Sequence, residues 1–163
     1  MIVLVMGVSG AGKSSVGAAL ARALDWRFLD ADDFHPPANV ARMAAGIALG
    51  DEDRWPWLDR IHGELERIEA SGGSAVLACS ALKQAYRQRL SRGLASVKTV
   101  YLHGSYELIH ARAATRVHRY MPAALLQSQF DALEPPQDAI AVDVARPPQE
   151  CLARILGALG RGA

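Results

Sequence analysis

Cysteine is scarce in this sequence, and so are long apolar runs. Only two cysteines occur among 163 residues, Cys79 and Cys151, and they form no Cys-x-x-Cys pair. A disulfide framework or a cysteine-ligated metal is therefore not expected. We expect both thiols to be buried in the protein, and the protein to reside in a reducing compartment. No apolar stretch reaches the length of a bilayer span. The first residues lead directly into a glycine-rich segment, so we expect them to belong to the fold and not to a signal peptide.

An excess of one charge sign is missing as well. Eighteen Lys and Arg oppose 17 Asp and Glu, for a formal net charge of +1. This balance gives no reason to expect nucleic acid or a membrane as a partner. Internal repeats and low-complexity tracts are also missing, and the composition is 50% hydrophobic and 21% charged. We therefore expect one globular domain over residues 1–163, located in the cytoplasm.

Short apolar segments alternate with helical patterns along the chain. The clearest helical pattern places apolar residues at 58, 61, 65 and 68. Such alternation predicts an α/β fold, a three-layer α/β/α sandwich with a five-stranded parallel sheet. Strands are expected at 2–6, 27–29, 75–79, 99–102 and 140–144. Since ligands bind beyond the carboxyl ends of such strands, functional residues are expected directly after each of them.

The segment after the first strand has the pattern of a phosphate-binding loop. Residues 7–14 read Gly-Val-Ser-Gly-Ala-Gly-Lys-Ser, between an apolar strand and a helical segment. The glycines let backbone N–H groups approach an anion, and the helix start adds partial positive charge. Lys13 can reach the β- and γ-phosphates, and the Ser14 hydroxyl can ligate Mg²⁺. The alternative is a glycine-rich turn that binds nothing, which the flanking strand and helix disfavour. The residues expected to hold ATP are Gly7, Val8, Ser9, Gly10, Ala11, Gly12, Lys13, Ser14 and Ser15.

Three carboxylates follow the second strand, at Asp30, Asp32 and Asp33. Beside a bound nucleotide, one could hold Mg²⁺ and another could accept a proton from a hydroxyl nucleophile. A helix N-cap cluster is the alternative, and both roles can hold at once. The third strand lacks the Asp that often completes such a metal site, so metal binding is expected to fall on Ser14, the phosphates and Asp30.

Two cations between and after these strands have two interpretations each. Arg54 is flanked by carboxylates and followed by tryptophans at 55 and 57. It could clamp a substrate carboxylate, or the segment could simply be a helix start with acidic residues in its first turn. Lys83 follows the third strand and is either a substrate contact or a solvated helix lysine.

Arginines recur after the fourth strand at three- and four-residue spacing, at Arg112, Arg116 and Arg119. They share one helix face and precede a break at Tyr120-Met121-Pro122. This arrangement suits a mobile lid, at about residues 113–130, that neutralises the transferring phosphate. An ordinary exposed basic face is the alternative.

Five segments together resemble the gluconokinase family, small phosphate-loop sugar-acid kinases related to shikimate kinase. The glycine loop at 6–14 is common to many kinases. The other four are more discriminating: Phe-Leu-Asp-Ala-Asp-Asp-Phe-His-Pro at 28–36, Asp-Glu-Asp-Arg-Trp-Pro-Trp-Leu at 51–58, Ala-Cys-Ser-Ala-Leu-Lys at 78–83, and residues 121–136 with their Gln-Ser-Gln-Phe. They extend over nearly the whole chain in the family's order.

The resemblance implies transfer of the ATP γ-phosphate to the 6-hydroxyl of D-gluconate, with Mg²⁺, which gives 6-phosphogluconate and ADP. It also implies a nucleoside-monophosphate-kinase-like fold with a helical lid, and often a homodimer. By position, Asp30 would lie near Mg²⁺ and Asp32 would contact the reacting hydroxyl. The positions expected to line the sugar-acid pocket are His35, Arg54 and Lys83; those in the nucleotide and lid region are Arg112, Arg116 and Arg119. Arg119 stands where the family usually has His, and could add a phosphate contact.

Rival interpretations stay open. Another small-molecule kinase of the same fold would act on shikimate or a nucleoside monophosphate. A nucleotide-dependent switch or binding module is a different class, but the chain contains no D-x-x-G and no N-K-x-D motif. A degenerate kinase that serves only as an interaction subunit is disfavoured by the intact Gly-Lys-Ser.

Overall fold

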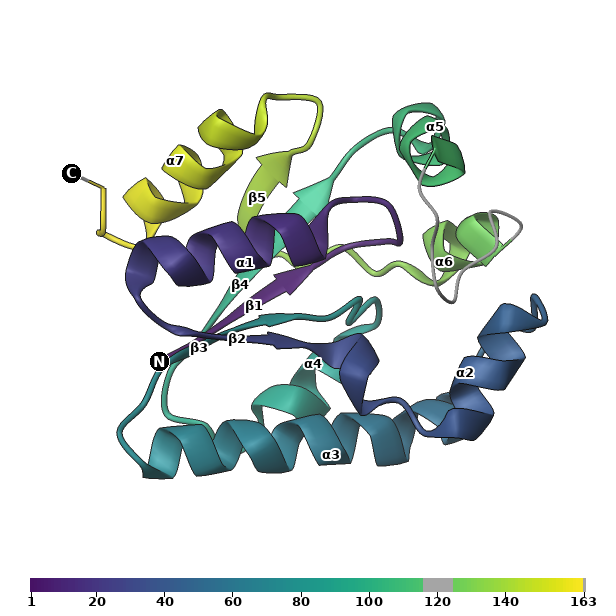
Figure 1. Cartoon of the computed structure of the whole chain (residues 1–163), viewed down its shortest axis with the longest axis horizontal. Coiled ribbons are helices and arrows are strands. Elements are labelled where there is room, and N and C mark those ends of the chain that lie inside the picture. Colours follow the sequence, from purple (N-terminus) through teal and green to yellow (C-terminus); the bar gives the residue numbers. More distant parts are fainter. Residues whose placement is uncertain (116–124, 163) are drawn as a thin grey trace.

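The computed structural model describes residues 1–115 and 125–162. Strands and helices alternate along the chain, as the sequence predicts (Figure 1). In chain order they are β1 (Ile2–Met6), α1 (Lys13–Leu24), β2 (Arg27–Asp30), the 3₁₀ helix η1 (Ala31–Phe34), α2 (Pro37–Ala44), α3 (Asp51–Ala70), β3 (Ala75–Ala78), α4 (Gln84–Ser91), β4 (Val97–His103), α5 (Tyr106–Thr115), α6 (Leu126–Ala132), β5 (Ile140–Asp143) and α7 (Pro148–Ala158).

The five strands form one parallel sheet in the order β2-β3-β1-β4-β5. Helices α1 and α7 cover one face of the sheet, and α3 and α4 cover the other (Figure 1). The predicted three-layer α/β/α sandwich is therefore confirmed. All five predicted strands occur, with ends that differ from the prediction by at most two residues.

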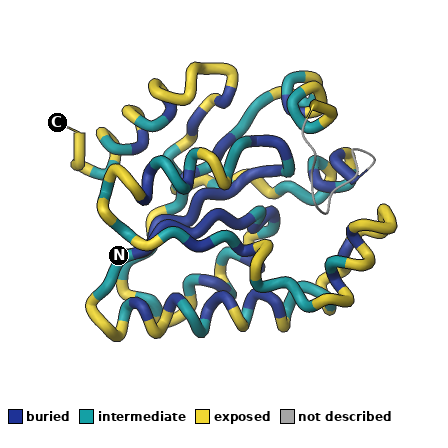
Figure 2. Tube along the Cα trace, in the orientation of Figure 1, coloured by how far each residue is buried: buried dark blue, intermediate teal, exposed yellow. Residues whose placement is uncertain are grey.

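The central strand β1 is buried on both faces, which explains its uninterrupted apolar sequence. Ile2, Leu4 and Met6 pack in the core cluster that includes residues of α3 and α4. Val3 and Val5 pack in the cluster that includes residues of α1 and α7. Each β1 side chain is at most 2% exposed. Figure 2 shows this burial as the dark centre of the sheet.

The strand order changes direction at β1, where the chain crosses from one side of this strand to the other. β1 pairs with β3 on one side and with β4 on the other. Parallel strands bring their carboxyl ends to one edge, so the segments that follow β1, β2 and β3 gather there. Helices α5 and α6 lie at the same end of the sheet (Figure 1).

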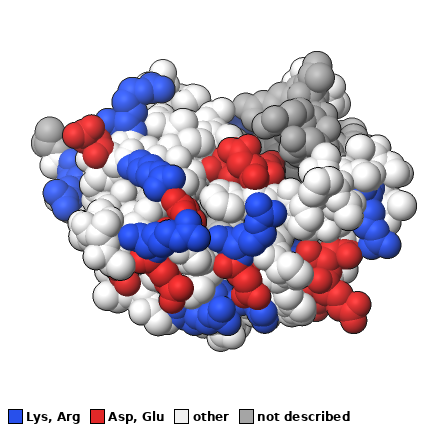
Figure 3. Space-filling model, turned by 60° about the horizontal axis from the view of Figure 1, so that its bottom comes forward, with Lys and Arg blue, Asp and Glu red and all other residues white. Residues whose placement is uncertain are grey.

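Both cysteines are free and buried, as predicted. Burial raises the pKa of the Cys79 thiol to about 12. Within the described residues, no helix is both long enough and apolar enough to cross a bilayer. On the face shown in Figure 3, basic and acidic side chains lie interspersed, in keeping with the near-zero net charge.

Truncation of a core residue in α3 should destabilise the fold. Ile61 is fully buried at 0% exposure, so we expect Ile61→Ala to lower the free energy of unfolding by about 2–4 kcal/mol, since a cavity remains. Urea denaturation measures this change. Arg60→Ala, at the exposed neighbouring position, should stay within about 0.5 kcal/mol of the wild type. Equal effects of the two substitutions would contradict this packing of α3.

Candidate active site

The glycine loop after β1 packs so tightly that it excludes side chains at two positions. A Cβ atom at Gly7 would lie 2.7 Å from the carbonyl oxygen of Leu102 in β4. A Cβ atom at Gly10 would lie 3.2 Å from both the Ile109 carbonyl oxygen and the Ala113 Cβ of α5, and Gly10 has a φ of +84°. The loop therefore fits between the end of β4 and α5 only because these residues are glycines.

The start of α1 is arranged to receive an anion. Its N-cap residue Gly12 has a φ of +92° and provides no side-chain hydrogen bond to the helix. The first N–H groups of α1 thus have no side-chain cap, and the space beside Gly12 is open to 4 Å. Phosphate oxygens are suitable acceptors for such N–H groups. Lys13 Nζ donates to the Val8 carbonyl oxygen at 3.0 Å, so the lysine lies along the loop.

The two residues predicted to hold Mg²⁺ lie in direct contact. Ser14 Oγ, in the first turn of α1, donates to Asp30 Oδ2 at the end of β2, at 2.6 Å. The other oxygen of Asp30, Oδ1, accepts from the Asp32 backbone N–H at 3.0 Å and so caps η1. The helix-cap interpretation of Asp30 is therefore confirmed, and its role as a Mg²⁺ ligand stays a prediction. A hydroxyl and a carboxylate beside a phosphate site form the hard-oxygen donor set that Mg²⁺ prefers.

The charged groups of the loop and of η1 lie around the end of β3. Burial is the largest cause of the raised pKa of the Cys79 thiol. Smaller electrostatic contributions to its pKa come from Lys13, Asp32 and Asp30. Asp32 lies next to the predicted metal position, because its backbone N–H donates to Asp30, and its catalytic role stays a prediction.

His35 is held in a fixed, uncharged state beside η1. Its ring stacks on Trp57, with centroids 4.1 Å apart and planes 13° from parallel. Its Nδ1 lies 3.3 Å from Asn39 Nδ2. Burial, and then the positive charge of Arg54, lower the His35 pKa to about 4. The imidazole is therefore neutral near pH 7, and can exchange hydrogen bonds with a hydroxyl group without carrying charge.

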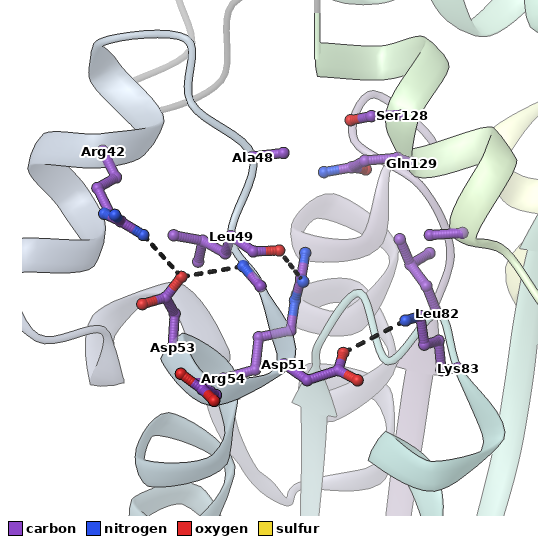
Figure 4. A pocket seen from close by; sticks show the side chains of 13 residues that line it. Arg42, Ala48, Leu49, Asp51, Asp53, Arg54, Leu82, Lys83, Ser128 and Gln129 are labelled. Carbon is purple, nitrogen blue, oxygen red and sulfur yellow. Dashed lines mark hydrogen bonds and ion pairs between the residues drawn. The ribbon is translucent and has the colours of Figure 1, made fainter.

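A cavity of about 640 Å³ lies beside the start of α3 and α4, and we call it the α3–α4 cavity (Figure 4). Its size is that of a small-molecule site. Two predicted substrate residues, Arg54 and Lys83, line it, whereas Asp32 and His35 are not among its lining residues. The cavity is lined by Arg42, Ala48, Leu49, Gly50, Asp51, Glu52, Asp53, Arg54, Leu82, Lys83, Ser128, Gln129 and Ala132.

Arg54 is both part of a helix start and a cavity residue, so its two interpretations are compatible. Asp53 Oδ2 accepts the Gly50 backbone N–H at 2.9 Å and the Arg42 guanidinium at 3.0 Å, which fixes the first turn of α3. From that turn, Arg54 Nη1 donates to the Leu49 carbonyl oxygen and lies 3.4 Å from the Tyr86 hydroxyl.

Gln129 is a site residue that sequence analysis missed. Its Oε1 accepts the backbone N–H of Ser9 at 2.7 Å, across 120 residues of sequence. The side chain is 8% exposed and also lines the α3–α4 cavity. A signal existed, because Gln129 is a polar residue at a helical spacing otherwise taken by Leu125, Leu126 and Leu133.

The structure tests the predicted lid only in part. Arg112 lies on α5, the helix whose Ile109 and Ala113 contact Gly10. Arg116, Arg119 and the central lid segment fall outside the described residues. The lid and the roles of all three arginines stay predictions.

The lowered pKa of His35 predicts a pH effect on stability. Between its usual value of 6.5 and about 4, the unfolded chain binds more protons at this site than the folded chain. The free energy of unfolding should therefore fall as pH falls through this window. Above pH about 6.5 the His35 site should cause no such loss of stability. NMR titration of the ring should give a midpoint near 4, and Arg54→Met should raise it. A midpoint near 6.5 in the wild type would contradict the burial of His35.

Comparison with known proteins agrees with this geometry. Residues 2–136 match the family described as AAA domain. The chain is 46% identical to a probable gluconokinase of Rattus norvegicus, over 97% of each chain. A gluconokinase structure from Sinorhizobium meliloti matches with a TM-score of 0.87 and 44% identity, over 98% of this chain and 91% of that one. A sugar kinase structure from Janibacter matches with a TM-score of 0.91 and 41% identity, over 98% and 94%. The chain belongs to the gluconokinase family.

Proposed function

We propose that this chain transfers the γ-phosphate of ATP to the 6-hydroxyl of D-gluconate, with 6-phosphogluconate and ADP as products. One observation carries the proposal: Gln129 lines the α3–α4 cavity and also accepts a hydrogen bond from Ser9 of the phosphate loop. A cavity lined by Arg54 and Lys83 thus lies directly beside the loop that would hold ATP. The relatives named gluconokinase agree with this arrangement.

The nucleotide would be held by residues 7–15. The loop N–H groups and the uncapped start of α1 would bind the phosphates, and Lys13 would move from the Val8 carbonyl to the β- and γ-phosphates. Ser14 and Asp30 would hold Mg²⁺, which supplies charge neutralisation of the phosphates when bound. Arg112, and in the lid Arg116 and Arg119, would add positive charge around the transferring group.

The sugar acid would bind with its carboxylate in the α3–α4 cavity. Arg54 presents a planar guanidinium there and Lys83 an ammonium group, both suited to a carboxylate. The opposite end of the substrate would then reach towards Asp32 and His35. The neutral His35 ring could bond to a hydroxyl of the sugar chain without a charge that repels Lys83 or Arg54.

Asp32 would orient the 6-hydroxyl and accept its proton as the new O–P bond forms. Phosphoryl transfer requires little covalent help from the protein, so positioning and charge neutralisation would supply most of the rate enhancement. Asp32 is suited to this role because it follows β2 at the carboxyl edge of the sheet, next to the Ser14–Asp30 pair. We further propose that residues 1–163 act as one kinase domain in the cytoplasm. We also propose a homodimer, which the family resemblance implies.

The deciding experiment measures ADP release with Mg-ATP in the presence of single acceptors. The acceptors are D-gluconate, other sugar acids, shikimate and AMP. Stimulation by gluconate alone would support the proposal, and mass spectrometry should then find the phosphate on the 6-hydroxyl. Stimulation by a different acceptor would overturn the substrate assignment but keep the kinase mechanism. A lack of stimulation by every acceptor would favour a nucleotide-dependent switch.

Substitution of the proposed base should affect the chemical step and spare nucleotide binding. We expect Asp32→Asn to lower kcat by about 10²- to 10⁴-fold, the usual contribution of general acid–base catalysis. The Kd of Mg-ATP, measured by calorimetry, should change little. Asp33→Asn removes the same charge one residue further along η1 and should lower kcat far less. Equal losses in kcat and ATP affinity for Asp32→Asn would indicate a metal-binding or structural role instead.

A further inference from the structure

The Asp51 carboxylate connects the two helices that border the α3–α4 cavity. Asp51 is the first residue of α3. Its Oδ1 accepts a hydrogen bond from Lys83 Nζ at 3.3 Å and another from the Tyr86 hydroxyl. Figure 4 shows Asp51 and Lys83 facing each other at the cavity, with Arg54 close by. Lys83, one of the two cations proposed to bind the substrate, is therefore already paired with a carboxylate of the same chain.

Tyr86 is the buried residue that Asp51, Arg54 and Lys83 all contact. The residue is only 2% exposed, and its ring makes an edge contact with Trp55 at 5.6 Å. The Arg54 guanidinium lies 5.3 Å from the ring centroid and the Lys83 ammonium 5.6 Å from it. The hydroxyl of Tyr86 also lies 3.4 Å from Arg54 Nη1. Both cations are thus arranged around one buried aromatic ring.

The two cations differ in how they are paired. Lys83 forms its ion pair with Asp51, whereas in the described part of the chain Arg54 forms no ion pair with a carboxylate. The hydrogen bonds of Arg54 to Leu49 and Tyr86 both use Nη1. Its Nη2 and Nε atoms make no hydrogen bond to a described residue, and a carboxylate binds a guanidinium through two such N–H groups.

The Asp51–Lys83 pair is exposed enough to exchange partners. The Asp51 side chain is 47% exposed and that of Lys83 is 35% exposed. Ion pairs at such positions contribute about 0–1 kcal/mol, so their replacement by another ion pair costs little. The hydrogen bond from Tyr86, and then that from Lys83, lower the Asp51 pKa, and Asp51 raises the Lys83 pKa. Both groups therefore carry full charge near neutral pH.

We propose that Asp51 is a displaceable counter-ion that sets the charge preference of the site, a role that rests on the proposed sugar-acid kinase function. In the free enzyme Asp51 holds Lys83 against Tyr86. An acidic substrate places its carboxylate between Lys83 and the unused N–H groups of Arg54, and takes over the ion pair from Asp51. A neutral polyol offers no replacement charge, so Lys83 stays with Asp51 and the neutral acceptor gains nothing from either cation.

Removal of the Asp51 charge should therefore favour acidic acceptors. The experiment measures KM and kcat for D-gluconate and for the neutral polyol D-glucitol. The variants are Asp51→Asn, Lys83→Met and the double variant. Glu52→Gln is the matched control, because it removes the same charge from the same helix turn and cavity wall without touching Lys83.

We expect Asp51→Asn to lower the KM for gluconate about two- to fivefold relative to Glu52→Gln. This fold-change corresponds to the free energy that an exposed ion pair contributes. The kcat should stay within about twofold, and the KM for glucitol should not fall. Lys83→Met should raise the KM for gluconate. In the Lys83→Met background, Asp51→Asn should have no further effect of its own, because the pair no longer exists.

Two results would overturn the proposal. A KM for gluconate that rises in Asp51→Asn, as it does in Lys83→Met, would mean that Asp51 positions Lys83 for the substrate. A change no different from that of Glu52→Gln would mean that only overall charge matters. Thermal melting checks that each variant folds, and Asp51→Ser, which keeps a polar residue at the helix start, replaces Asp51→Asn if that variant does not fold.

The wild-type measurements separate this inference from the proposed function. If the wild type phosphorylates another sugar acid and not gluconate, the proposed substrate is wrong, and the same variants then test the counter-ion with that acid. A preferred acceptor without a carboxylate would overturn the counter-ion role, even if the kinase mechanism holds. A wild type that phosphorylates no acceptor would overturn both.

Discussion

The burial of β1 on both of its faces is the constraint on which the site depends. Four of its residues pair with β3 on one side and all five pair with β4 on the other, and their side chains contribute to both core clusters. The loop that leaves this strand starts from a rigid position, between the end of β4 and α5. Backbone N–H groups can bind phosphate selectively only if they are held in place, and here the core of the sheet holds them.

Much of the fold could be predicted because burial leaves a direct trace in the sequence. A parallel strand covered on both faces reads as an uninterrupted apolar run, as in β1 and β3, and the ends of these strands were predicted closely. The glycine loop was predictable because its close approach to Leu102 and Ile109 tolerates no side chain at Gly7 or Gly10. In both cases the physical requirement acts on neighbouring residues, so a local pattern records it.

The rest of the site depends on contacts between residues far apart in the sequence. Ser9 and Gln129 are 120 positions apart, and Asp51 and Tyr86 are 35 apart. Tyr86 lies in the core, and no local pattern could indicate that its hydroxyl contacts Asp51 and Arg54, two residues that line the cavity. Local reasoning likewise left two roles open for Asp30 and Arg54. The structure shows the structural contact of each residue and leaves its predicted site role open.

Tyr86 belongs to the hydrophobic core, and its hydroxyl also contacts Asp51, which lines the cavity. Its ring packs among residues of α3, while its hydroxyl and ring face contact the charged groups proposed to select the substrate. Stability and substrate selection are consequently not independent traits at this position. Directed evolution towards a more heat-resistant core around α4 would also alter the choice of acceptor, and a library aimed at new acceptors would have to retain this aromatic anchor.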